Sequence, residues 1–232
     1  MGNLAFLFPG QGAQVVGMGK DFFDRYDLAK KRFAEADEAL GYSISKLCFE
    51  GPADQLQLTA HTQPAILTVA VIASELLRAE GIEPEIAAGH SLGEYAALVA
   101  AGVLSFQDAV LLVHKRGAYM QEAVPVGEGA MAAVIGLDDE TIVSACAEAS
   151  SVGAVQAVNF NCPGQTVIAG TAKGVEHAVT LLQEKGAKKA VILPVSAPFH
   201  STLMEPAAKK LAAELDKVEL HDAAFPVVSN YT

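Results

Sequence analysis

A serine flanked on both sides by glycines is the strongest chemical signal in this sequence. Residues 89–93 read Gly-His-Ser-Leu-Gly, which fits the G-x-S-x-G pattern of a nucleophile elbow. A short apolar run, residues 86–88, precedes this pentapeptide, and a helix-prone run, residues 94–101, follows it. At such a strand-to-helix turn the hydroxyl of Ser91 is exposed, and the amide of Leu92 can point at a developing oxyanion near the positive end of the helix. The pattern predicts acyl chemistry with Ser91 as nucleophile.

A serine hydroxyl is a weak nucleophile and needs a general base, for which six histidines are available. His90 adjoins Ser91, but neighbouring side chains at a sharp turn point in different directions, which favours a structural role. Four others fall in predicted polar loops or inside predicted helices: His61, His114, His177 and His221. His200 follows the serine along the chain and lies in a loop, as the base does in α/β-hydrolases. We therefore predict that His200 is the base.

The acid that would complete a triad is not evident. The carboxylates between residues 138 and 184 fall in a stretch that we assign below to a separate subdomain. We expect a Ser–His dyad, in which a backbone carbonyl or an amide side chain orients His200.

Arg116, beside Lys115 on a predicted helix, has two interpretations. It can be a solvated cation on the helix surface. Alternatively, its guanidinium can reach the cleft and hold a substrate carboxylate in a two-pronged contact. Position along the chain leaves both open.

Composition limits the class of protein. The 232 residues are 51% hydrophobic and 19% charged, enough for one large domain or two small ones. The net charge of −11 argues against nucleic acid as the main partner. Because no window approaches the roughly 20 apolar residues of a membrane span, and no secretory signal is evident, we expect neither a membrane partner nor export.

Three widely spaced cysteines indicate neither a disulfide framework nor a zinc site. Cys146 lies on an apolar helical face and is expected in the core. We expect a cytoplasmic protein without metal or cofactor.

The periodicity of apolar residues predicts alternating strands and helices in the larger part of the chain. Strands are expected at residues 4–8, 86–88 and 225–229. Helices are expected at 21–40, 64–80, 106–121 and 205–217, with Ser105 capping the third of these.

Residues 127–196 follow a different pattern. Strands are expected at 131–137, 154–159, 165–169 and 189–195, with helices at 138–149 and 171–185. This order is the β-α-β-β-α-β split unit of ferredoxin-like folds. We therefore expect an α/β protein in two parts: residues 1–126 plus 197–232 form a parallel-sheet core, and residues 127–196 form a small inserted subdomain.

Six motifs, in order along the whole chain, resemble those of the malonyl-CoA:acyl carrier protein transacylases, a family related to the acyltransferase domains of polyketide synthases. They are FPGQGAQ at 8–14, TQPA at 62–65, GHSLGE at 89–94, KRG at 115–117, NCPGQ at 161–165 and APFHS at 197–201. The resemblance implies an α/β-hydrolase-like core with a ferredoxin-like insertion. It also implies malonyl transfer from malonyl-CoA to acyl carrier protein in fatty acid biosynthesis.

The resemblance implies a role for each matching residue. Ser91 is the nucleophile, His200 the general base and acid, and Arg116 the anchor of the malonyl carboxylate. The oxyanion hole comes from the backbone amides of Gln11 and Leu92. The remaining residues line the substrate site: Gln63, Met120 near the acyl group, and Phe199, which is typical of the malonyl-selective members.

Family members usually continue for several tens of residues past a segment like 225–232, so we expect a shortened chain whose His200 is poorly oriented and whose core is exposed. We expect a monomer, with an acidic carrier protein docking near Lys188 and Lys189. The alternatives are a serine esterase or thioesterase, a polyketide-associated acyltransferase and a non-catalytic carrier-binding module.

Overall fold

The computed structural model describes residues 4–125, 127–195 and 197–231. Its internal contacts divide the chain into two units. The first unit contains Met1–Ala118 and Leu211–Thr232, and the second contains Tyr119–Lys210. The expected insertion, 127–196, is bounded by residues 126 and 196, which lie outside the described residues.

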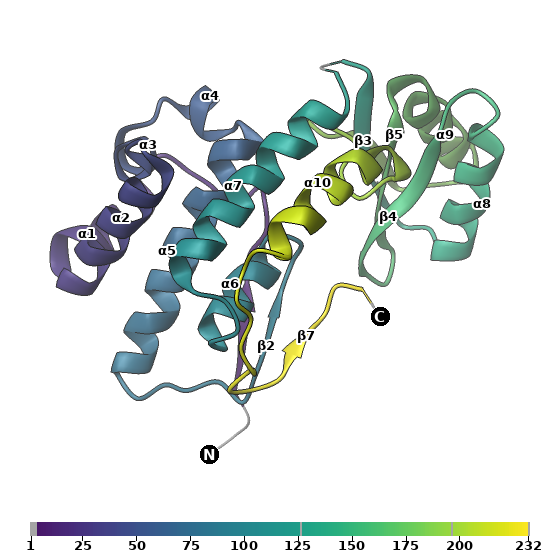
Figure 1. The fold of residues 1–232 in the computed structure, drawn as a ribbon. Coiled ribbons are helices and arrows are strands. Elements are labelled where there is room, and N and C mark those ends of the chain that lie inside the picture. The colour runs from purple at the N-terminus through teal and green to yellow at the C-terminus, as the bar shows by residue number, and fades with distance from the viewer. Residues whose placement is uncertain (1–3, 126, 196, 232) are drawn as a thin grey trace. The chain divides into compact units, whose positions relative to one another are not determined.

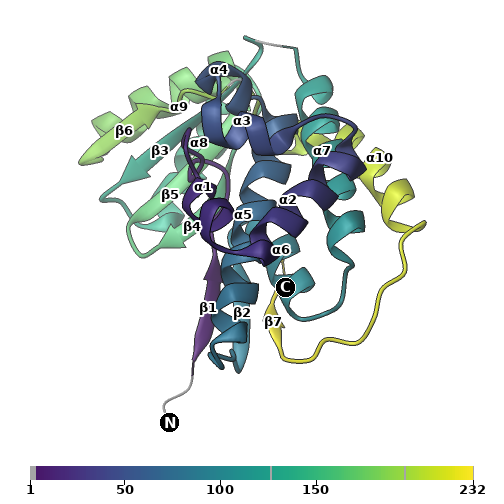
Figure 2. The same cartoon turned by 90° about the vertical axis from the view of Figure 1, so that its left-hand side faces the viewer.

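A parallel sheet of three strands organises the first unit. Its strands are β1 (Ala5–Phe8), β2 (Ile86–Gly89) and β7 (Val227–Val228), in the order β1-β2-β7 (Figure 2). Phe8 pairs with Gly89, so the loops after β1 and β2 leave the sheet at the same edge. Parallel sheets place their functional groups at this carboxyl edge.

The helices of this unit pack mostly on one another, with α6 against β1 and β2 and α5 against α6 (Figure 1). In chain order they are α1 (Lys20–Arg25), α2 (Asp27–Leu40), α3 (Ile44–Glu50), α4 (Ala53–Leu56), α5 (Thr59–Ala79), α6 (Gly93–Ala100) and α7 (Phe106–Ala123). The alternating residues Phe6 and Phe8 of β1 point into the core, whereas Leu7 is 78% exposed. The Ser105 hydroxyl accepts a hydrogen bond from the amide of Asp108, so the expected cap of α7 is confirmed.

The single helix expected over residues 21–40 is wrong, because the chain forms two helices that meet at Tyr26. Tyr26 is extended, with φ −125° and ψ 126°. The break places Phe23 of α1 edge-on to Phe33 of α2, with ring centroids 6.0 Å apart. The helical period of apolar residues continues across the break, so periodicity alone did not reveal it.

Helix α5 begins at Thr59, five residues before the expected start at Pro64. A proline inside a helix leaves the carbonyl four residues earlier without its donor. Here that carbonyl, on Ala60, accepts a hydrogen bond from Nδ1 of His114 at 2.9 Å. Proline is tolerated because a side chain from α7 replaces the missing N–H.

Helix α5 is also long and apolar enough to cross a membrane, the one such helix in the described part of the chain. About 61% of its apolar window is buried inside the structure. Core helices of globular proteins pass the same test, and we interpret α5 as one of these.

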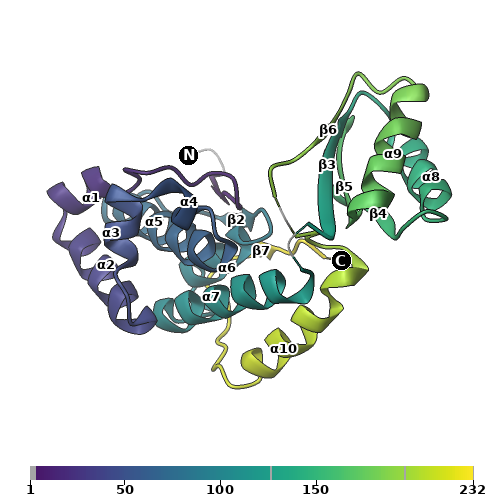
Figure 3. The same cartoon turned by 90° about the horizontal axis from the view of Figure 1, so that it is seen from above.

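The second unit contains a four-stranded antiparallel sheet in the order β4-β5-β3-β6. The strands are β3 (Gly129–Ile135), β4 (Val155–Cys162), β5 (Gln165–Thr171) and β6 (Lys189–Ile192). Helices α8 (Asp139–Ala149) and α9 (Ala172–Glu184) cover one face (Figure 3). The β-α-β-β-α-β order is therefore confirmed. The chain continues through the short helix η1 (Thr202–Met204) into α10 (Glu205–Leu215).

Candidate active site

The turn between β2 and α6 has the geometry of a nucleophile elbow. Ser91 has φ 52°, in the left-handed region that residues other than glycine rarely adopt. A Cβ at Gly89 would lie 1.9 Å from the carbonyl carbon of Gly93, and one at Gly93 would lie 2.2 Å from the carbonyl oxygen of Phe8. The two glycines thus let three backbone segments cross beside Ser91.

Two backbone amides at this edge are available to a ligand. Among the described residues, the N–H groups of Gln11 and Leu92 have no acceptor within the protein. The loop after β1 lies against the elbow, since a Cβ at Gly10 would be 2.5 Å from the carbonyl oxygen of His90. The side chain of Gln11 is turned to the start of α5, 3.4 Å from Oγ1 of Thr59. Unused N–H donors beside a nucleophile suit a developing oxyanion.

Arg116 reaches the nucleophile from α7. Its Nη2 donates to Oγ of Ser91 at 3.0 Å, and its Nη1 donates to Oε1 of the buried Gln63 at 2.8 Å. Helix α7 approaches α5 closely at Gly117, where a Cβ would be 2.5 Å from the carbonyl oxygen of Thr59. The guanidinium therefore does not lie on the helix surface, where the first interpretation placed it.

Burial is the main electrostatic influence on this guanidinium. It lowers the pKa of Arg116, against the opposing effects of Tyr95 and Glu94. The ring of Tyr95 lies 5.7 Å from Cζ of Arg116, and burial raises the pKa of the Tyr95 hydroxyl. A desolvated cation gains from an incoming carboxylate more than a hydrated one does.

Asn230, which sequence analysis missed, completes the elbow. Its Oδ1 accepts a hydrogen bond from the amide of Ser91 at 2.7 Å, and its Nδ2 donates to the carbonyl of Gly89 at 2.6 Å. The backbone N–H of Asn230 also donates to Oε2 of Glu94 at 3.2 Å. The available signal was its position, just after a strand of a parallel sheet.

The second unit carries the other predicted site residues. Met120 and Phe199 are buried in one apolar cluster with Met204. His200 follows at φ 64° and is exposed. The turn that presents it is closed by Ser201, whose hydroxyl donates to the carbonyl of Pro198 at 2.7 Å.

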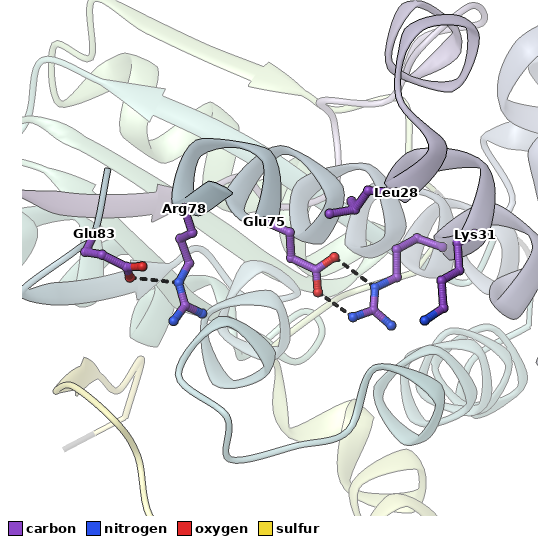
Figure 4. Close-up of a pocket in the computed structure, with 6 residues that line it drawn as sticks. Leu28, Lys31, Glu75, Arg78 and Glu83 are labelled. Atoms are coloured by element: carbon purple, nitrogen blue, oxygen red, sulfur yellow. Dashed lines mark hydrogen bonds and ion pairs between the residues drawn. The ribbon is translucent and has the colours of Figure 1, made fainter. Parts of the chain in front are cut away.

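A separate pocket of about 470 Å³ lies beside α2 and α5 (Figure 4). Arg32 binds Glu75 through two hydrogen bonds and Glu35 through a third, and Arg78 binds Glu83. Because carboxylates already hold these guanidinium groups, we assign no anion site there. Across the residues that the structure describes, no group of three or more His, Cys, Asp or Glu side chains could hold a metal ion.

Comparison with known proteins gives one consistent family. Residues 5–231 match the model of the acyl transferase domain. The malonyl CoA-acyl carrier protein transacylase of Bacillus subtilis is 54% identical over 231 residues, which are 99% of this chain and 73% of that protein.

Solved structures agree with this match. The crystal structure of an acyl carrier protein S-malonyltransferase from Vibrio cholerae is 50% identical with a TM-score of 0.95, covering 99% of this chain and 75% of that one. A malonyl-transacylase solved in complex with a type II polyketide acyl carrier protein is 47% identical with a TM-score of 0.96, covering 99% and 74%. The chain thus spans about three quarters of the length of these relatives.

Proposed function

This chain belongs to the malonyl-CoA:acyl carrier protein transacylases of the acyl transferase family, and from that premise we propose how its residues carry out malonyl transfer. The family and the function expected from the six motifs are confirmed. The enzyme moves a malonyl group from malonyl-CoA to acyl carrier protein in fatty acid synthesis. Both carriers are thiols, so the reaction exchanges one thioester for another.

In the first half-reaction Ser91 takes the malonyl group. His200 accepts the hydroxyl proton of Ser91 as Oγ attacks the thioester carbonyl carbon. The amides of Gln11 and Leu92 stabilise the tetrahedral oxyanion, where one such donor typically contributes about 3 kcal/mol. The C–S bond then breaks, the proton moves from His200 to the CoA sulfur, and malonyl-Ser91 remains.

The second half-reaction reverses these steps with a different thiol. The thiol of the carrier's phosphopantetheine arm gives its proton to His200 and attacks the malonyl ester. The Oγ–C bond breaks, and Oγ of Ser91 recovers the proton. One serine and one histidine thus serve both directions, without a cofactor.

The observation that carries this mechanism is the 3.0 Å hydrogen bond from Arg116 to Ser91. It supports the proposal that this desolvated cation holds the far carboxylate of a Ser91-bound malonyl group. Gln63 keeps one guanidinium nitrogen in place while the other exchanges Oγ of Ser91 for the carboxylate. An acetyl group offers no such carboxylate, so Arg116 favours malonyl.

Met120 and Phe199 are the proposed lining of the acyl site. Met120 follows Arg116 by one helical turn on α7, which places both side chains on the same side of that helix. The bulk of Phe199, directly before His200, would exclude the extra methyl of methylmalonyl. We place the reaction in the cytoplasm and treat the enzyme as a monomer.

Intact-mass measurement after mixing with malonyl-CoA tests the mechanism. We expect one malonyl adduct, mapped to Ser91 by peptide analysis, and none in Ser91→Ala. Folded protein without an adduct would contradict the mechanism and favour a carrier-binding module. An adduct that water removes as fast as a thiol does would instead indicate a thioesterase.

A polyketide role is the second candidate, because one relative is a malonyl-transacylase bound to a type II polyketide carrier. Transfer rates to a fatty-acid carrier and to a polyketide carrier, measured side by side, distinguish the two. We expect the fatty-acid carrier to be the better acceptor.

A further inference from the structure

Asn230 lies on the nucleophile elbow although 139 residues separate it from Ser91 in the sequence. From this contact we infer that Asn230 is a positioning residue, which holds the backbone of Ser91 in its reactive conformation. The inference rests on the proposed role of Ser91 as nucleophile. It adds a residue that follows β7 to the machinery of acyl transfer.

The side chain of Asn230 uses both ends of its amide. Oδ1 accepts from the N–H of Ser91 at 2.7 Å, and Nδ2 donates to the carbonyl of Gly89 at 2.6 Å. An amide side chain carries an acceptor and a donor on one planar group, and that of Gln is longer than that of Asn by one methylene. The amide therefore joins the last residue of β2 to the nucleophile and spans the residue between them.

This connection acts where the backbone is least favourable. Ser91 has φ 52°, and a conformation of that kind persists only when its surroundings enforce it. The bond to Asn230 also uses the N–H of Ser91, which leaves the amides of Leu92 and Gln11 as the donors for the oxyanion. Asn230 thereby decides which amides face the reacting carbonyl.

A third bond fixes Asn230 itself. Its backbone N–H donates to Oε2 of Glu94, in the first turn of α6, at 3.2 Å. Two residues before Asn230, Val228 of the short strand β7 pairs with Ala88 of β2. Asn230 is thus held from the strand side and from the helix side, so its amide can orient the turn between them.

The test compares three variants with the unsubstituted chain. Asn230→Ala removes both side-chain bonds. Asn230→Asp keeps the acceptor for the Ser91 amide but sets an oxygen against the carbonyl of Gly89. Gly41→Ala is the control, since it strains the positive-φ end of α2 and its new Cβ would contact no residue of the elbow. Rapid quenching after mixing with malonyl-CoA, followed by intact-mass analysis, gives an amplitude and a rate constant of acylation.

The rate constant separates positioning from stability. The amplitude counts folded enzyme, whereas the rate constant measures the reactivity of each folded molecule. We expect Asn230→Ala and Asn230→Asp to lower the rate constant on the order of 10- to 100-fold, since misplacing a reacting group by about 1 Å can cost 10²-fold. We expect the KM for malonyl-CoA to stay within about twofold of the parent value, because the substrate anchor Arg116 is untouched. Gly41→Ala should lower thermal stability and leave the rate constant unchanged.

Two results would contradict the inference in distinguishable ways. If the parent forms the adduct and Asn230→Ala acylates with the same rate constant, the positioning role is wrong and the mechanism stands. If the parent forms no adduct on Ser91, the proposed mechanism fails, and the inference fails with it.

Discussion

Arg116 donates a hydrogen bond to the hydroxyl of Ser91 over 3.0 Å and thereby joins helix α7 to the turn that follows β2. Gln63 of α5 holds the second guanidinium nitrogen at 2.8 Å. Three elements thus meet at one charged group beside the nucleophile. The cation is in place before any substrate arrives, so its position needs no rearrangement of the helices.

Arg116→Ala should impair malonyl transfer far more than acetyl transfer. A charge-assisted hydrogen bond contributes about 1.5–3 kcal/mol, which corresponds to roughly a 10- to 100-fold loss with malonyl-CoA. Arg116→Lys keeps the charge but not the planar fork, so it should restore only part of the loss. Steady-state rates with both acyl-CoA substrates measure the effect. Equal losses for the two substrates would reject the anchor role.

Gly93→Ala should destabilise the first unit. The new Cβ would lie 2.2 Å from the backbone carbonyl oxygen of Phe8, and backbone cannot yield as a flexible side chain does. We expect the free energy of unfolding to fall by about 3 kcal/mol or more in denaturant titrations. Gly41→Ala is the control: at φ 72°, with nothing within 4 Å of its Cβ, it should cost about 1 kcal/mol. Similar losses at both positions would contradict the crossing of backbones at the elbow.

Glu214→Gln should lower thermal stability in a manner that depends on pH. Hydrogen bonds from Lys115 and Lys217 lower the pKa of Glu214 from 4.5 to about 2. A carboxyl whose pKa is lower in the folded protein than in the unfolded protein stabilises the fold at pH values above its unfolded pKa. This stabilisation is lost as the pH falls through its folded pKa. The difference in melting temperature between parent and variant should therefore be full at neutral pH and shrink from about pH 4.5 toward pH 2. The exposed Glu219→Gln is the control, and a difference that does not vary with pH would refute the ion-pair explanation.

One thiol of the three should react quickly with iodoacetamide. Burial raises the pKa of Cys48 to about 12 and that of Cys146 to about 11, so little thiolate forms near pH 8. Cys162 is exposed. Peptide mapping after brief labelling should find the modification at Cys162, and Cys162→Ser should remove the fast phase. Early labelling of Cys48 or Cys146 would show that their helices open readily.

Charge reversal at Lys188 and Lys189 should slow transfer to the carrier protein and leave acylation by malonyl-CoA unchanged. Both side chains are exposed at the start of β6, and acyl carrier proteins are typically acidic. Opposite charge mainly accelerates encounter, so we expect roughly a 3- to 10-fold loss that salt reduces. Transfer assays at two ionic strengths measure it. Unchanged rates would place the docking surface elsewhere.

Local pattern in the sequence was sufficient for the elbow and for the order of elements. The glycine spacing around Ser91 and the β-α-β-β-α-β order of the second unit depend on residues close together in the chain. So does the cap of α7 by Ser105, three residues before Asp108. Features of this kind can be predicted from a sequence because they depend on backbone geometry and side-chain periodicity over a few residues.

Tertiary packing decided the features that local pattern did not predict. The chain breaks at Tyr26 so that Phe23 can meet Phe33, and Pro64 fits inside α5 because His114, 54 residues from Ala60, supplies the missing donor. The contact of Asn230 with Ser91 spans 139 residues, and that of Arg116 with Ser91 spans 25. A hydrogen bond between distant residues leaves no periodic trace in the chain, since it exists only after the sheet and helices have brought its donor and acceptor together.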